Sequence, residues 1–77
     1  MIPLEEMEKV LEELIELQRK KVFRVAEEMG LRLTQEDILN PHDFPALLKS
    51  PRFNFEDGIL AGLLSAQMAL RQTLKKL

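Results

Sequence analysis

Residues 55–76 read FEDGILAGLLSAQMALRQTLKK, and the spacing of their apolar side chains predicts one long helix. Small side chains recur along one side of this helix, next to a broad face of leucine and isoleucine. The small residues are Gly58, Gly62, Ser65 and Ala69. A glycine inside a helix costs about 0.5–1 kcal/mol relative to alanine, so Gly58 and Gly62 indicate that another backbone passes close by.

A second long helix is predicted over residues 4–29, where large apolar side chains recur every three or four positions. These side chains cover about half of the helix circumference. Pro3 suits the first turn, and the glutamates that follow it suit the positive end of the helix dipole. Gly30 is expected to end this helix.

The segment between the long helices, residues 31–53, is broken by prolines but holds too many apolar residues to be a flexible linker. Thr34 and Asp37 resemble a capping box, which predicts a short helix over residues 35–39. A second short helix is predicted from residue 43 or 44 to residue 49, with Pro45 in its first turn.

The last helix is expected to begin after Asn54, which would cap it with Asp57 as reciprocal partner. These elements predict an all-α fold and a single helical domain over residues 1–77. In this fold two long antiparallel helices are joined by a Pro-rich segment that contains two short helices.

The composition argues against several kinds of chemistry. The chain has no cysteine and a single histidine, so disulfides, cysteine-based metal sites and multi-histidine zinc sites are excluded. His42 and Asp43 are the only histidine and carboxylate that are neighbours, and no activated nucleophile completes a catalytic set. We therefore expect no enzyme activity, no cofactor and no metal.

Charge and hydropathy narrow the choice of partners. A net charge of −2 counts against nucleic acid and anionic membranes as general partners. The longest apolar stretch, Ile59 to Leu70, is too short to cross a bilayer, which takes about 20 residues. The N-terminus has neither the basic nor the apolar region of a signal peptide. A cytoplasmic location without membrane association is expected.

The two long helices carry more apolar surface than one short connecting segment can easily cover. A helix that is apolar around most of its circumference is usually buried in a larger assembly. We therefore predict a homodimer in which two copies form a bundle of four long helices. In the alternative, residues 31–53 fold back and cover the remaining apolar surface within a monomer.

The order of charges suggests one arrangement for such a dimer. Residues 4–16 hold six glutamates and one lysine, a net charge of −5, and residues 19–24 hold four basic residues. Two antiparallel copies of this helix would place each acidic half beside a basic half, with the axis near Glu16 to Gln18. A polar Gln18 within the apolar stripe would then fix the register. Alternatively, these charges form ordinary pairs four residues apart on a solvated face, and the orientation stays open.

The candidate interface residues follow from these patterns. They are Leu14, Gln18, Phe23, Gly58, Gly62, Ser65 and Ala69. Phe23 lies away from the apolar stripe, where it is either an anchor for a partner or covered by residues 31–53. The candidate contacts to an anion or an acidic partner are Arg19, Lys20, Lys21 and Arg24.

The predicted function is that of a small, non-enzymatic helical module for homodimerisation and for binding another protein. The alternative is a nucleic-acid-associated protein that uses the basic cluster of residues 19–24. The two short helices resemble a helix-turn-helix, but the second offers only Lys49 and lacks side chains that read base edges. An enzyme with a site at His42 and Asp43 has the least support.

Overall fold

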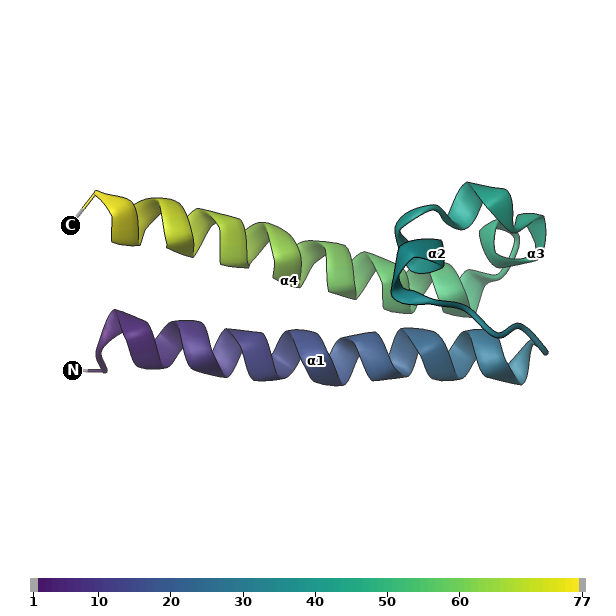
Figure 1. Ribbon diagram of the computed structural model, residues 1–77, viewed down its shortest axis with the longest axis horizontal. Helices are drawn as coiled ribbons and strands as arrows, with labels where there is room; N and C mark the ends of the chain where they lie inside the picture. The colour runs from purple at the N-terminus through teal and green to yellow at the C-terminus, as the bar shows by residue number, and fades with distance from the viewer. Residues whose placement is uncertain (1, 77) are drawn as a thin grey trace.

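The computed structural model describes residues 2–76, apart from the side chain of Ile38, and its regular structure within this range is entirely helical. The elements are α1 (Leu4–Glu28), α2 (Gln35–Leu39), the 3-10 helix η1 (Pro41–Asp43), α3 (Pro45–Leu48) and α4 (Pro51–Lys75). Helices α1 and α4 run antiparallel side by side, and the short elements gather at the end away from the two termini (Figure 1). The result is a rod of 44 × 20 × 18 Å.

Helix α1 ends as the sequence predicts. Gly30 has a φ of +81°, in the left-handed region that favours glycine. The Gly30 N–H donates to the Glu27 carbonyl at 2.9 Å, and the Leu31 N–H donates to the Ala26 carbonyl at 2.9 Å. This pair of hydrogen bonds is a Schellman motif, which satisfies the last carbonyls of the helix and turns the chain toward α2.

The connecting segment also follows its local signals. The Thr34 hydroxyl accepts a hydrogen bond from the Asp37 N–H at 3.2 Å, and the Asp37 carboxylate accepts one from the Thr34 N–H at 2.9 Å. The predicted capping box is therefore confirmed, and α2 occupies the predicted residues. Pro45 occupies the first turn of α3, also as predicted.

The start of α4 corrects the prediction. The helix begins at Pro51, and Ser50 caps it by accepting a hydrogen bond from the Phe53 N–H at 3.1 Å. Proline is favoured at the first helical position because its missing N–H has no partner there anyway. Asn54, predicted to be the cap, instead lies inside the helix, where its Nδ2 donates to the Leu48 carbonyl at 2.9 Å.

The hydrophobic core lies in the half of the rod next to the connecting segment. Its buried members are Ile15, Val22, Val25, Ala26, Leu47, Phe53 and Leu60. Among the described residues, no side chain before Ile15 or after Leu60 is buried. The ribbons of α1 and α4 lie closest near the connecting segment and diverge toward the termini (Figure 1). The half of the helix pair near the termini therefore has no closed core of its own.

Candidate interaction surface

Gln18 is the polar residue that the sequence places in the apolar stripe, and it is 5% exposed. Its Nε2 donates to the Glu56 carbonyl oxygen at 2.8 Å and to Glu56 Oε2 at 2.9 Å. Both amide hydrogens therefore find acceptors on α4 of the same chain. This pairing links α1 to α4 within one chain. That Gln18 also fixes the register between two copies stays a prediction. The sequence gives no sign of Glu56 as the partner, because the two residues are far apart along the chain.

The stripe of small residues on α4 faces outward. Gly58, Gly62, Ser65 and Ala69 are all exposed. A Cβ atom added at Gly58 or Gly62 would have no neighbour within 4 Å. Within one chain, therefore, no backbone passes close to these glycines, and the expected close approach is not made inside the monomer. The space that they leave is open to a second molecule.

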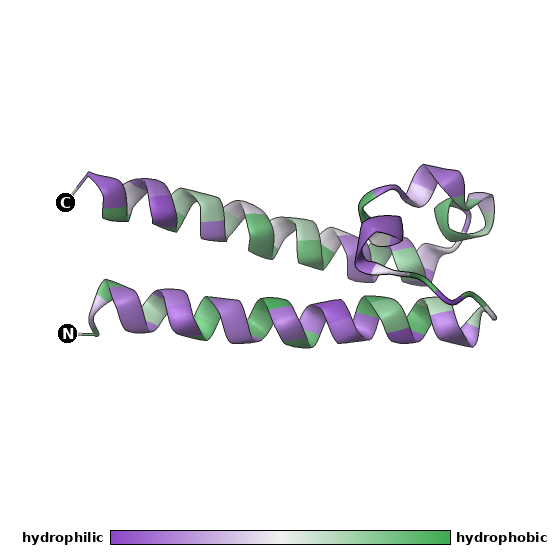
Figure 2. Cartoon of the chain, viewed as in Figure 1, coloured by the Kyte–Doolittle hydropathy of each residue, from purple (hydrophilic) through white to green (hydrophobic). Residues whose placement is uncertain are grey.

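This outward surface of α4 is also free of charge. From Gly58 to Leu70 the sequence contains no charged residue, although most of these positions are exposed. The ribbon of α4 is mostly pale or green over its middle turns, whereas hydrophilic and hydrophobic positions alternate along α1 (Figure 2). A solvated helix usually carries charged or strongly polar residues on its outer face. Between Gly58 and Leu70 the outer face of α4 carries none of the charged residues that are usual on a solvated helix.

Helix α1 exposes a stripe of large apolar side chains beside its buried face. They are Met7, Val10, Leu14 and Leu17, between 43% and 56% exposed. Their spacing of three and four residues places them on one side of the helix. Lys21 and Arg24 continue the same spacing and share a surface hollow with Arg52 of α4. Arg52 precedes Ile59 by seven residues, so both lie on the same flank of α4.

These relationships define one surface, which we call the open face. It consists of the exposed stripe of α1 and the adjoining flank of α4 that carries Phe55, Ile59, Gly62 and Ala66. Phe55 is 64% exposed and Ile59 is 38% exposed. The connecting segment covers the opposite side of the helix pair, so nothing within the described chain covers the open face.

Phe23 lies on the side of the helix pair opposite the open face, which we call the covered side. It is half-buried, packs against the core and lines a small apolar cavity of about 80 Å³. The other lining residues are Arg19, Gln35, Leu39, Leu60 and Leu64. Phe23 therefore shares this cavity with Gln35 and Leu39 of its own connecting segment. Ligand pockets are usually about 300–1,000 Å³, so this cavity is too small for one.

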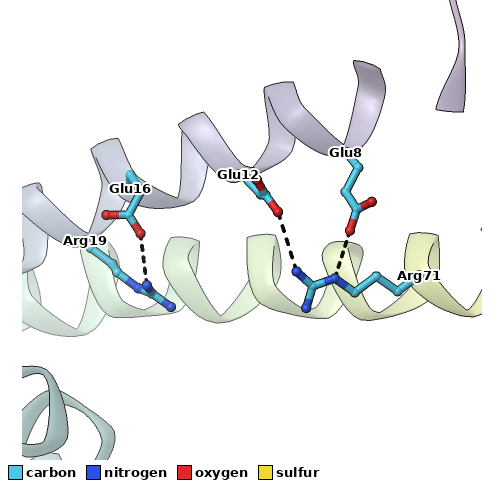
Figure 3. A network of polar contacts seen from close by, with 5 residues as sticks. All are labelled: Glu8, Glu12, Glu16, Arg19 and Arg71. Atoms are coloured by element: carbon cyan, nitrogen blue, oxygen red, sulfur yellow. Dashed lines mark hydrogen bonds and ion pairs between the residues drawn. The ribbon is translucent and has the colours of Figure 1, made fainter. Parts of the chain in front are cut away.

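A network of ion pairs joins the terminal halves of α1 and α4 on the covered side (Figure 3). Arg71 Nε donates to Glu8 Oε1 at 2.9 Å, and its Nη2 lies 3.6 Å from Glu12 Oε1. Arg19 pairs with Glu16 of the preceding turn at 3.0 Å. These side chains are partly or fully exposed, so each pair contributes at most about 1 kcal/mol.

The members of the basic cluster of residues 19–24 differ in their surroundings. Arg19 is half-buried and pairs with Glu16, whereas Lys21 and Arg24 lie at the hollow beside Arg52. Arg52 itself pairs with Glu28. Nucleic-acid binding requires several basic side chains directed at one backbone. This geometry does not favour a nucleic-acid interface.

His42 and Asp43 lie on η1 at the surface. The His42 Nε2 is 3.5 Å from Asp43 Oδ1, and their side chains are 70% and 65% exposed. Within residues 2–76, no group of three acidic, histidine or cysteine side chains is placed to hold a metal ion.

Over the same range, no helix is both long and apolar enough to span a membrane. Comparisons with protein-family models, with curated proteins and with solved structures find no match.

Proposed function

We propose that this chain is a small, non-enzymatic helical module whose working form is a homodimer that binds another protein. The solvent-exposed area of the chain is the main support for this proposal. The chain exposes 5837 Å², whereas a compact monomer of its mass exposes about 4,800 Å². The excess is about 1,000 Å², and a stable protein interface buries about 800 Å² on each partner. A second copy would bring the exposed area per chain to the value of a compact protein.

The position of the excess surface supports the same function. The large exposed apolar side chains of α1 gather in one stripe, and the exposed middle of α4 carries no charge. Contiguous apolar patches of this kind mark protein contacts, whereas single exposed apolar residues are ordinary.

Sedimentation equilibrium tests the dimer directly. We expect a species with twice the 8.9 kDa mass of the chain at micromolar concentration. A species that stays at the mass of one chain at high micromolar concentration would overturn the proposal. Heteronuclear relaxation of the same sample gives an independent value for the mass of the species, because rotational tumbling slows as mass increases.

A further inference from the structure

We infer that a second copy of this chain packs on the open face in antiparallel orientation. The two-fold axis passes α1 between Leu14 and Leu17 and passes α4 near Gly62. In this arrangement α1 packs on α1 of the second copy, and α4 packs on α4. This inference rests on the proposed homodimer and adds which surface forms it and how the copies are oriented.

Charge complementarity favours the antiparallel orientation. Glu6 and Glu13 flank one half of the open face, and Lys21 and Arg24 lie in the other half. Among the described residues, none of these four side chains forms an ion pair. When α1 packs on α1 of the second copy, the acidic half of one helix meets the basic half of the other only if the two-fold axis lies in the interface, perpendicular to the rod. A parallel packing of α1 on α1 would place like charges together.

Arg71 does not neutralise the acidic half. Although it lies at the same end of the rod, its guanidinium is directed to Glu8 and Glu12 on the covered side (Figure 3). The glutamates flanking the open face are therefore available to the basic half of another copy. Electrostatic pairing of this kind fixes orientation more than it raises affinity.

The spacing along α1 sets the register. Met7, Val10, Leu14 and Leu17 repeat with the three-and-four spacing of a heptad, and Lys21 and Arg24 follow in the same positions. With the axis between Leu14 and Leu17, Leu14 of each copy packs on Leu17 of the other copy. Val10 and Met7 then lie opposite Lys21 and Arg24, whose aliphatic stems cover apolar surface while their charged ends reach toward glutamate.

The same axis crosses the uncharged part of α4. Gln18 contacts Glu56, and Glu12 lies beside Arg71, so Leu14 lies level with the part of α4 around Gly62. Gly62 is at the middle of the uncharged run, and the position of its absent Cβ is open. Small side chains at this crossing allow the two α4 helices to approach to about 8 Å, the short end of the usual range.

The first test replaces Leu14, with Leu48 as the matched control. The two leucines are 46% and 47% exposed, but Leu48 lies on α3, which contributes no residue to the open face. We expect Leu14→Glu to raise the dimer dissociation constant at least tenfold and Leu48→Glu to leave it within twofold. A dimer that tolerates Leu14→Glu as well as Leu48→Glu would overturn the inference and leave the proposed homodimer standing. A wild-type monomer would overturn both.

The second test exchanges charges. In the antiparallel register Glu13 of one copy lies beside Lys20 of the other. Glu13→Lys and Lys20→Glu are each expected to raise the dissociation constant several-fold, and the double variant is expected to recover it. The two residues are seven apart on one helix, too far for a direct pair within a chain. Additive losses in the double variant would overturn this register.

The third test measures orientation. The chain has no cysteine, so Glu5→Cys gives a single site for a spin label. With the axis between Leu14 and Leu17, two labels at residue 5 are about 30 Å apart along the rod, at 1.5 Å per residue. A parallel dimer would hold them below about 20 Å, at the spacing of helices in a bundle. A short distance measured by pulsed electron paramagnetic resonance would therefore overturn the antiparallel arrangement.

Discussion

Gln18 and Glu56 join the two long helices through two hydrogen bonds from one side-chain amide. Removing the amide leaves the half-buried Glu56 carboxylate and carbonyl to find other donors. We expect Gln18→Ala to lower the free energy of unfolding by about 1–3 kcal/mol, measured by urea denaturation. The control is Gln67→Ala, since no hydrogen bond of the Gln67 side chain is found among the described residues. Equal losses in both variants would mean that the Gln18 hydrogen bonds contribute nothing specific.

Two neighbouring phenylalanines test the position of the core. Phe53 is fully buried, whereas Phe55 is 64% exposed. Phe53→Ala removes a large side chain and leaves a cavity, so it is expected to cost about 3–5 kcal/mol of folding free energy. Phe55→Ala is expected to stay within about 0.5 kcal/mol of the wild type. Both are measured by chemical denaturation at a concentration where the chain is monomeric. The reverse order would show that α4 is rotated about its axis.

The corrected start of α4 is tested at Ser50. Its hydroxyl accepts from the Phe53 N–H, and loss of such a cap costs about 0.5–2 kcal/mol. Ser50→Ala is therefore expected to lower the midpoint of thermal unfolding. Ser65→Ala, at an exposed position inside the same helix, is expected to keep or slightly raise it, because alanine has the higher helix propensity. A drop at Asn54→Ala alone would favour the predicted cap over the observed one.

Asp57 gives the chain a dependence on pH. Burial raises the pKa of its carboxyl above the usual 3.8. The folded state therefore binds the proton more tightly than the unfolded state, and stability is lost as pH rises from below 3.8 through the raised pKa. Asp57→Asn stays neutral throughout. Its stability relative to the wild type is expected to be smallest near pH 3 and to increase toward neutral pH, as measured by urea unfolding. A difference that stays constant across this range would contradict the pKa shift.

Gly62 separates the stability of the monomer from that of the dimer. A Cβ at this position meets no atom within 4 Å, so Gly62→Ala should raise the unfolding free energy of the monomer by about 0.5–1 kcal/mol. The Cβ of Gly62→Leu meets no atom of its own chain either, but in the antiparallel dimer the larger side chain would overpack the crossing of the two α4 helices. Denaturation is therefore expected to show a more stable monomer for Gly62→Ala. Sedimentation is expected to show a weaker dimer for Gly62→Leu. A less stable monomer in Gly62→Ala would contradict the finding that the space around the added Cβ is open.

Local signals predict much of this fold. Gly30 ends α1, Thr34 and Asp37 cap α2, and Pro45 opens α3, because each of these features depends only on residues within one turn. The start of α4 is wrongly predicted because Ser50 and Asn54 are both good caps. The observed start at Ser50 puts Pro51 at the first helical position and the fully buried Phe53 in the first turn.

The candidate site is less predictable because it depends on which surfaces meet. The bond from Gln18 to Glu56 spans 38 residues of sequence, so no local pattern indicates it. The sequence identifies the small residues around Gly62 as a contact surface, but it does not say whether the contact lies within one chain. Only the arrangement of the helix pair shows that this side is left open.

Both ends of the described chain leave the rod at the same side, away from the connecting segment (Figure 1). In the antiparallel dimer the two copies would therefore send their ends in opposite directions. Any domain fused to the module would be held about one rod length, 44 Å, from the domain fused to its twin. The pair would then act as a rigid spacer that holds two attached proteins apart.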